Sequence, residues 1–299
     1  MGRYLISGAS GLIGGALAKA LGREGAEIVQ LVRGPARNES EISWNGKDGR
    51  PALSPQSLSG FEGVIHLAGE SIVGRWTESK RKAIRESRVR TTRSLAEGLA
   101  GAAAKPKVFV SASAIGFYGN RDDEILTEQS AGGKGFLAEV SREWEDATQA
   151  ASAAGIRVVH LRTGVVLSSQ GGALGKMLTP FKLGLGGRIG SGKQWYSWIH
   201  IDDEVGAIRF ALGNDSLSGP INLTSPNPVR NSEFTQILAK VLGRPAIFPV
   251  PRFALALAFG GEAADELFLA SQRVEPAKLE AAGYRFQFPE LQTALANLV

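Results

Sequence analysis

The N-terminal stretch Arg3-Tyr4-Leu5-Ile6-Ser7-Gly8-Ala9-Ser10-Gly11-Leu12-Ile13-Gly14 decides the fold. An apolar, strand-like segment runs into glycines at every third position, and a helical pattern follows over residues 13–23. Gly8 permits a tight turn, Gly11 lets backbone N–H groups approach a diphosphate, and Gly14 lets the helix pack close to the strand. Unpaired N–H groups and the helix dipole favour an anion there. The stretch therefore predicts a dinucleotide-binding loop with contacts from Gly8, Ser10, Gly11, Leu12, Ile13 and Gly14.

The end of the second predicted strand indicates which dinucleotide is bound. An acidic residue there would hydrogen-bond a ribose 2′-hydroxyl and indicate NAD. This chain instead reads Gln30-Leu31-Val32-Arg33-Gly34-Pro35-Ala36-Arg37, which contains no acid. A guanidinium at Arg33 suits a 2′-phosphate, because it can donate two parallel hydrogen bonds to it. We therefore expect NADP(H) as the cofactor; Arg37 either assists or is a solvated loop residue.

Short apolar runs alternate with helical patterns through the first half of the chain. We expect strands at residues 4–7, 28–32, 64–67, 108–111 and 158–161, and helices at 13–23, 78–100 and 137–153. The strands are rich in Val, Ile and Leu, which is typical of parallel strands covered on both faces. The pattern predicts an α/β fold, a Rossmann-like doubly wound parallel sheet with a smaller C-terminal substrate lobe. We place the NADP-binding domain at 1–165, with some elements of 200–225 returning to it, and the substrate-side lobe and C-terminal helical segment at 166–299.

Composition narrows the class of protein. The 299 residues are 43% hydrophobic and 21% charged, as in an ordinary globular protein with a real core. The lack of cysteine excludes disulfides, thiolate metal sites and cysteine nucleophiles. No apolar run reaches the roughly 18 residues of a membrane span, and we see no secretion signal. We therefore expect a cytoplasmic protein that does not bind membranes. No His, Asp or Glu cluster has metal-ligand spacing, so we expect no metal.

The formal charge of +5 is concentrated between Lys80 and Arg93, where seven bases accompany a single acid, Glu86. This segment is either a solvated helix face or an electrostatic aid to an anionic cofactor or substrate. It has no interleaved aromatic residues and no reader motif, which argues against a nucleic-acid partner. The expected partner is a small-molecule substrate, and the sequence leaves the oligomeric state open.

Several motifs together resemble the extended short-chain dehydrogenase/reductase superfamily, on its sugar-nucleotide epimerase and dehydratase side. They are the glycine loop, Leu67-Ala68-Gly69, Ser111-Ala112-Ser113 followed by Tyr118-Gly119, and residues 198–203. Within it, the chain looks like the atypical branch known as epimerase family proteins, which has its own C-terminal segment. The marks of that branch are Leu67-Ala68-Gly69-Glu70, Arg75-Trp76, Ser87-Arg88, residues 162–167, residues 175–192 and Gly283-Tyr284-x-Phe286.

The resemblance implies an NADP(H) site that also uses Leu67, Ala68, Arg88 and Val166. Small residues at the end of a strand, here through Gly69, let a ribose or nicotinamide lie close to the backbone. Arg88 lies on the helix after that strand, where it can reach the phosphates or the adenosine side of the cofactor. The resemblance implies no particular substrate.

The catalytic residues of the superfamily are incomplete in this chain. Its reductases use a Tyr-x-x-x-Lys pair, in which the lysine lowers the pKa of the tyrosine, and a Ser or Thr from the preceding strand. Ser113 occupies the serine position, but Phe136 and Val140 stand at the other two. One interpretation is an NADP(H)-dependent oxidoreductase or epimerase-like enzyme for a small carbonyl or hydroxyl substrate, with Tyr118 as substitute acid. A second is hydride transfer with only Ser113 and water, and a third is a non-catalytic NADP(H)-binding sensor or interaction module.

Four further residues are candidates for the substrate side. Glu70 lies near the expected nicotinamide, although it can equally be a surface residue. Arg188 and Lys193 belong to a glycine-rich stretch, residues 183–195, that can shape a pocket or close over it, and their charges suit an anionic substrate. Trp195 either lines that pocket or packs in the core.

Overall fold

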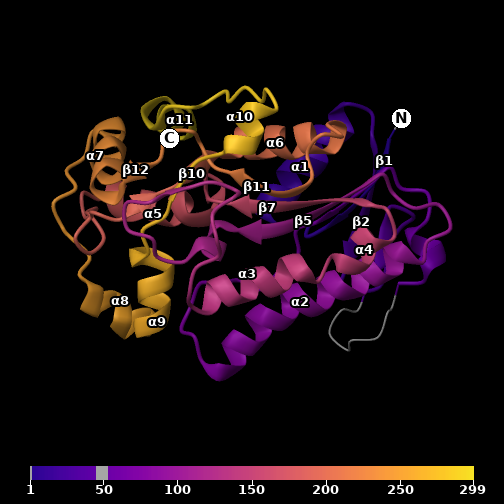
Figure 1. The fold of residues 1–299 in the computed structure, drawn as a ribbon. Coiled ribbons are helices and arrows are strands. Elements are labelled where there is room, and N and C mark those ends of the chain that lie inside the picture. Colours follow the sequence, from indigo (N-terminus) through magenta and orange to yellow (C-terminus); the bar gives the residue numbers. More distant parts are fainter. Residues whose placement is uncertain (1, 45–52) are drawn as a thin grey trace.

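A seven-stranded sheet runs through the computed structural model, which describes residues 2–44 and 53–299 (Figure 1). Its strands are β1 (Arg3–Ser7), β2 (Glu27–Val32), β3 (Glu41–Ser43), β4 (Gly63–His66), β5 (Val108–Ala114), β7 (Arg157–Thr163) and β11 (Gly219–Leu223). They lie in the order β11-β7-β5-β4-β1-β2-β3, and every neighbouring pair is parallel. The predicted doubly wound parallel sheet is therefore confirmed.

Helices cover both faces of this sheet, as Figure 1 shows. One face carries α1 (Leu12–Arg23) and α6 (Ile201–Gly213), and the other carries α2 (Glu78–Ala100), α3 (Phe136–Asp146) and α4 (Gln149–Ala153). Consecutive residues of one strand point to opposite faces. Ile6 therefore packs in the core beneath α1 and α6, and Leu5 packs in the core beneath α2 and α4. This double covering explains the near-continuous apolar strands.

The C-terminal lobe has a core of its own around Trp198 and Phe234. Around this core lie β8 (Val165–Ser168), α5 (Gly172–Lys182), β9 (Trp195–Tyr196), β10 (Trp198–His200), β12 (Val229–Arg230), α7 (Asn231–Leu242) and α11 (Leu291–Leu298). The remaining elements are η1 (Pro55–Leu58), η2 (Ile115–Tyr118), β6 (Ile125–Leu126), α8 (Arg252–Phe259), α9 (Gly261–Ala264), η3 (Asp265–Leu269, a π-helical turn), β13 (Arg273–Val274) and α10 (Ala277–Ala281). Among the described residues, no helix is long and apolar enough to cross a membrane.

The single helix predicted over residues 137–153 is wrong, because the structure has two. α3 ends at Asp146 and α4 begins at Gln149. Between them Thr148 donates a hydrogen bond from its hydroxyl to the Glu145 carbonyl oxygen at 2.7 Å and lies buried. A threonine hydroxyl that bonds a nearby carbonyl competes with the helical pattern, so the chain turns there without a glycine or proline.

Glu204 on α6 gives the fold a predicted pH dependence. Its side chain is fully buried, one oxygen accepts a hydrogen bond from Thr163 Oγ1 at 3.0 Å, and the other has no partner among the described residues. Burial raises the pKa of this carboxyl from 4.5 to about 8. The folded protein thus holds a proton that the unfolded chain releases. The free energy of unfolding should therefore fall as pH rises from about 4.5 to about 8, by at most about 1.4 kcal/mol per pH unit.

Glu204→Gln keeps the side chain neutral and should flatten this part of the pH curve, as urea unfolding across the same pH range can measure. Glu97→Gln, on the exposed side of α2, is the control and should leave the slope as in the unmodified chain. An unchanged slope in Glu204→Gln would show that Glu204 does not hold this proton.

Candidate functional site

The chain reverses its direction across the sheet between β1 and β4. From β1 it adds β2 and β3 on one side, and it then returns to add β4 on the other side of β1. Ligands of open α/β sheets bind in the crevice beyond the carboxyl ends of the strands at such a point. At this point Gly8 directly follows the end of β1, and Leu67 directly follows the end of β4. A Cβ atom placed on Gly8 would lie 2.8 Å from the Leu67 carbonyl carbon, so the two loops are in contact.

Each glycine of the loop after β1 has a structural reason. Gly8 has a φ of +75°, which a residue with a side chain rarely adopts. The Gly11 N–H donates to the Gly8 carbonyl oxygen at 2.9 Å, which closes the turn. A Cβ on Gly14 would overlap that same oxygen and lie 2.8 Å from its carbonyl carbon. Gly11 is the N-cap of α1 and no described side chain caps the helix, so its first N–H groups suit a diphosphate.

A buried hydrogen-bond chain fixes the loop after β4. Ser7 Oγ lies 2.5 Å from His66 Nδ1, His66 Nε2 lies 3.3 Å from Thr91 Oγ1, and the Ala68 N–H donates to Ser7 Oγ at 3.3 Å. Burial lowers the pKa of His66 to about 4, so the ring is neutral at physiological pH. These contacts tie β1, β4 and α2 together and hold the Leu67-Ala68-Gly69 backbone beside the glycine loop.

Arg88 points inward from α2, unlike most bases of its helix. Its guanidinium lies over the Trp144 ring at 5.0 Å, and Nη1 donates to the carbonyl oxygens of Glu70 at 2.9 Å and Ile84 at 3.2 Å. Burial lowers its pKa to about 10, so it still carries a charge at neutral pH. Among the described residues no carboxylate hydrogen-bonds this cation, and a Cβ on Gly69 would lie 3.3 Å from its Cζ. A phosphate beside Gly69 would satisfy it.

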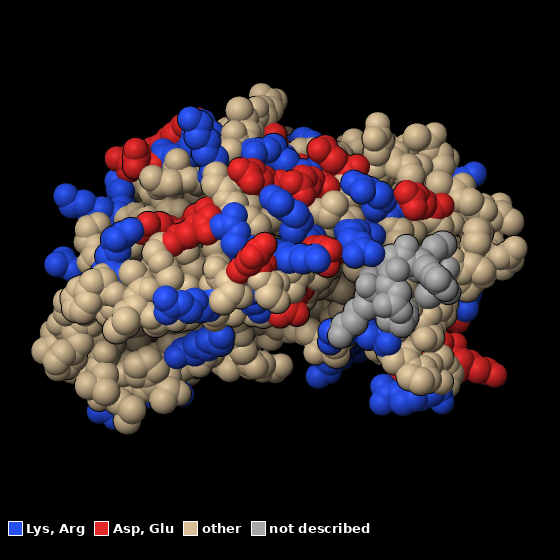
Figure 2. Space-filling model, turned by 90° about the horizontal axis from the view of Figure 1, so that it is seen from below, with Lys and Arg blue, Asp and Glu red and all other residues tan. Residues whose placement is uncertain are grey.

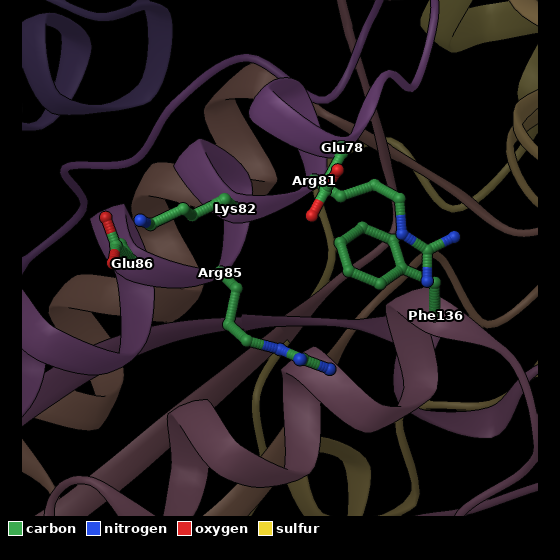
Figure 3. Close-up of a pocket in the computed structure, with 6 residues that line it drawn as sticks. All are labelled: Glu78, Arg81, Lys82, Arg85, Glu86 and Phe136. Atoms are coloured by element: carbon green, nitrogen blue, oxygen red, sulfur yellow. The ribbon is translucent and has the colours of Figure 1, made fainter.

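The other bases of the Lys80–Arg93 segment mostly pair with acids at the surface. Figure 2 shows Lys and Arg interspersed with Asp and Glu over the face formed by α2 and α3. The pairs are Lys80 with Glu70, Arg81 with Glu262, Arg85 with Glu139 and Glu143, and Arg90 with Glu86. Arg81 also covers the Phe136 ring in a shallow groove between the two helices (Figure 3). For these residues the solvated helix face is the better interpretation.

Arg33 follows β2 and is exposed, and no described residue makes a hydrogen bond or ion pair with its guanidinium. It is close enough to Glu70 to help Lys80 hold the pKa of that carboxyl below its usual range. Arg37 differs, because its guanidinium pairs with Glu41 at 3.0 Å. Arg33 is thus the available cation at the end of β2, and Arg37 is a surface loop residue.

Val166 approaches the glycine loop from the C-terminal lobe. It lies in β8, and a Cβ on Gly172 would lie 3.5 Å from the Val166 carbonyl oxygen and 3.2 Å from Leu12 Cδ2. The structure therefore gathers the predicted cofactor residues at one sheet edge: the glycine loop, Arg33, Leu67, Ala68, Gly69, Arg88 and Val166.

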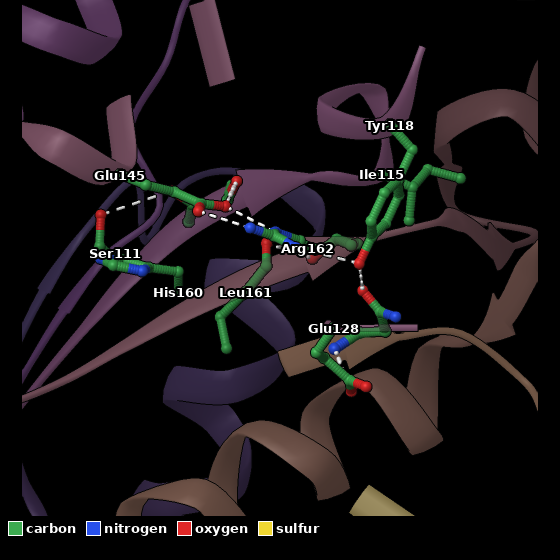
Figure 4. A network of polar contacts seen from close by, with 12 residues as sticks. Ser111, Ile115, Tyr118, Glu128, Glu145, His160, Leu161 and Arg162 are labelled. Atoms are coloured by element: carbon green, nitrogen blue, oxygen red, sulfur yellow. Dashed lines mark hydrogen bonds and ion pairs between the residues drawn. The ribbon is translucent and has the colours of Figure 1, made fainter. Parts of the chain in front are cut away.

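The predicted catalytic residues Ser113 and Tyr118 belong to a buried polar network, of which Figure 4 labels Tyr118, Glu145 and Arg162. Ser113 Oγ donates to Glu145 at 2.7 Å, and Arg162 donates two hydrogen bonds of 2.8 Å to that same carboxylate. Tyr118 is fully buried; its hydroxyl lies 2.7 Å from Asn222 Oδ1 and accepts from Arg162 at 3.1 Å. Burial raises the pKa of this phenol. Its position favours a structural hydroxyl over the substitute acid expected from the sequence.

The first turn of α3 packs against both α2 and the loop after β5. Phe136 and Val140 pack against Ile84 of α2. A Cβ on Gly116, just after β5, would lie 3.3 Å from Leu137 Cβ and 4.0 Å from Ser141 Oγ. Phe136 and Val140, assigned from the sequence to the tyrosine and lysine positions, are thus packing residues between α2 and α3. Leu137 and Ser141, which lie nearer to Gly116, likewise provide neither a phenol nor an ammonium group.

A cavity of about 320 Å³ opens beside this edge of the sheet. Its walls come from the loop after β5, the start of α3 and the C-terminal segment, and the lining residues are Gly116, Gly119, Asn120, Lys134, Leu137, Asp265, Glu266, Leu269, Ala270 and Gln272. Glu266 brings a half-buried carboxylate into it, which the sequence analysis missed. Nothing around Glu266 in the sequence signals this role, because its partners are about 130 residues away along the chain.

The four residues predicted for the substrate side are not brought together at this cavity. Glu70 pairs with Lys80 at 2.7 Å. Trp195 lies between the guanidinium groups of Arg230 and Arg273, 4.4 and 4.6 Å from its ring. Arg188 and Lys193 are exposed, and none of the four is among the described lining residues.

The close packing of α1 on the loop after β1 gives a direct test. Gly14→Ala should destabilise the protein by about 2 kcal/mol or more, because the new methyl group meets backbone that cannot move away easily. The matched control is Gly22→Ala on the same helix, where a Cβ has nothing within 4 Å. It should stabilise by about 0.5–1 kcal/mol. Urea unfolding measures both, and equal effects would contradict the packing described here.

Comparison with known proteins supports this geometry. Residues 4–223 match the NAD dependent epimerase/dehydratase family, and residues 250–298, which include Glu266, match a domain of unknown function, DUF1731. The chain is 42% identical to the epimerase family protein Mb2239 of Mycobacterium bovis over 97% of this chain and 95% of that one.

Two solved structures are also similar. The human epimerase family protein SDR39U1, crystallised with NADPH, superposes with a TM-score of 0.89 at 35% identity, covering 99% of this chain and 98% of that one. A nucleoside-diphosphate sugar epimerase from Corynebacterium glutamicum gives a TM-score of 0.82 at 40% identity, covering 99% of this chain and 58% of the other. The motif match, the sheet order and these similarities agree: the chain belongs to the NAD dependent epimerase/dehydratase family.

Proposed function

We propose that this protein is an NADP(H)-dependent oxidoreductase or epimerase of the extended short-chain dehydrogenase type, acting on a small carbonyl or hydroxyl compound. The observation that carries the cofactor choice is Arg33, an exposed cation at the end of β2, where an NAD-specific protein would have an acid. The human relative crystallised with NADPH supports the same choice.

The residues present fit such a cofactor. The uncapped N–H groups that follow Gly11 would bind the diphosphate, and Arg33 would pair with the 2′-phosphate. Ala68 and Gly69 leave room for a ribose, Arg88 offers a second, half-buried cation, and Val166 lies close to Leu12 of the glycine loop. When bound, the nicotinamide supplies or accepts a hydride.

A second candidate is a non-catalytic NADP(H)-binding sensor or interaction module. It is favoured by one observation: Phe136 and Val140, which stand at the tyrosine and lysine positions assigned from the sequence, carry no group that can exchange a proton. Binding of the cofactor is common to both candidates, and turnover separates them.

The cofactor preference is tested by Arg33→Ala. The unmodified protein should bind NADPH more tightly than NADH, and the variant should lose about 1.5–3 kcal/mol of NADPH binding with little change for NADH, because a charged hydrogen-bond donor is removed. Fluorescence titration of both dinucleotides measures this. Arg37→Ala, whose guanidinium is occupied by Glu41, is the matched control and should keep the preference. Tighter binding of NADH by the unmodified protein would reject NADP(H), and binding of neither would reject the proposed function.

Turnover is tested by following NADPH oxidation with diacetyl, dihydroxyacetone and 4-nitrobenzaldehyde. We expect oxidation with at least one probe, and a loss of about tenfold or more in Ser113→Ala, which removes a hydroxyl at the end of β5. Tyr118→Phe should keep the rate within a few-fold but lower the stability, because Asn222 loses a buried partner. NADPH binding without oxidation by any probe would favour the binding module, and loss of turnover in Tyr118→Phe without loss of stability would restore Tyr118 as the acid.

A further inference from the structure

We propose that Glu266, contributed by the C-terminal segment, is the group that exchanges a proton with the substrate in the 320 Å³ cavity. This inference rests on the proposed function, because it assumes a nicotinamide at the adjacent sheet edge. It assigns a catalytic role to the region matched by the domain of unknown function, and it replaces the tyrosine that α3 lacks.

The position of the Glu266 carboxylate is fixed by α3. Its two oxygens accept hydrogen bonds from the backbone N–H groups of Phe136 and Leu137, each at 2.8 Å. These are the first two residues of α3, the turn on which reductases of the wider superfamily carry tyrosine. The carboxylate therefore lies at the N-terminal end of this turn, although it comes from a segment about 130 residues further along the chain.

The backbone around α3 leaves room for this carboxylate. Gly135, the N-cap of α3, has a φ of +108°, and a Cβ there would lie 2.7 Å from Glu266 Oε1. Any side chain at 135 would thus displace the acid. On the other side of the cavity, Gly116 and Gly119 follow β5 and also lack side chains. The cavity consequently connects Glu266 with the end of the strand that carries Ser113.

Burial and the neighbouring charges act on the pKa of the Glu266 carboxyl in opposite directions. Burial raises the pKa of its carboxyl above the ordinary value of 4.5, while the two N–H groups of α3 oppose that rise. Glu262 raises the pKa further and Arg81 lowers it. Lys134 and Asp265 also line the cavity. The Asp265 carboxylate is paired with Arg252 at 2.6 Å. Glu266 is thus the carboxylate of the cavity left without a cationic partner among the described residues.

Reduction of a carbonyl compound and oxidation of the alcohol each need one group that exchanges a proton, and Glu266 can be that group in both directions. In the reducing direction a hydride from C4 of the dihydronicotinamide forms a C–H bond at the carbonyl carbon, and the π electrons move to the oxygen. That oxygen takes the proton of the Glu266 carboxyl, leaving an alcohol and a carboxylate. In the oxidising direction the carboxylate accepts the hydroxyl proton as the hydride leaves. Solvent restores the protonation state of Glu266 after each turnover.

The lining of the cavity narrows the substrate class. Lys134 is the single cation among the lining residues described, whereas a sugar nucleotide brings two phosphate charges that need several donors. A volume of about 320 Å³ lies at the lower end of ligand pockets. We therefore assign a small, uncharged carbonyl or polyhydroxy compound to it.

Carbon-13 NMR of protein labelled at the glutamate carboxyl tests the assignment without any substrate, and Glu266→Gln identifies the resonance. The nicotinamide ring is cationic in NADP⁺ and neutral in NADPH. If Glu266 lies beside the ring, its pKa should be lower in the NADP⁺ complex than in the NADPH complex by about one pH unit. Glu128, which also accepts backbone N–H bonds but is not among the described lining residues, is the matched control and should not shift.

Equal pKa values of Glu266 in the two complexes would overturn the inference, and Glu266 would be only a helix cap. Binding of neither dinucleotide would instead overturn the proposed function. As a second measurement, NADPH oxidation by diacetyl should fall about a hundredfold in Glu266→Gln. Glu266→Asp should recover part of the rate, and NADPH binding should be unchanged in both. An undiminished rate in a folded Glu266→Gln protein would likewise reject the role.

Discussion

The close approach of α1 to the loop after β1 is the constraint on which the rest of the structure depends. Gly14 packs so tightly against Gly8 that no side chain fits between the helix and the strand. This contact aims the open N-terminus of α1 across the point where the strand order reverses. The buried chain through Ser7 and His66 then places the backbone after β4 alongside. The cofactor residues follow from this geometry, because each lies at the end of a strand that the sheet has already positioned.

A buried ion pair lies next to Ser113. Glu145 and Arg162 lie almost entirely inside the protein, and Arg162 donates two hydrogen bonds to the Glu145 carboxylate. Such a pair is costly to desolvate, so it is retained only where its geometry is complete. Here the pair also engages Ser113 and Tyr118 and thereby joins β5, β7 and α3. The network therefore fixes the end of β5 relative to β7 and α3.

Most of the fold could be predicted from the sequence because its signals are local. The glycine spacing, the apolar strands and the missing acid before Gly34 each lie within a few consecutive residues. Less of the candidate site could be predicted from the sequence, since its contacts join segments that are far apart along the chain. Tyr118 meets Asn222 about a hundred residues away, so nothing near Tyr118 shows that its hydroxyl is occupied. The environment of the first turn of α3 is hidden for a similar reason, because only tertiary packing shows that Leu137 lies beside Gly116.

The pairing of β13 with β6 attaches a late part of the sequence to an earlier one, so the dinucleotide-binding sheet and the last wall of the cavity come from different parts of the chain. Arg273 and Val274 lie parallel to Ile125 and Leu126, and this short ladder attaches the C-terminal segment to the loop that leaves β5. During synthesis the ribosome can release the whole seven-stranded sheet, completed at residue 223, well before the last wall of the cavity exists. Mutations in that late segment can therefore alter what enters the cavity while the dinucleotide-binding core is left untouched.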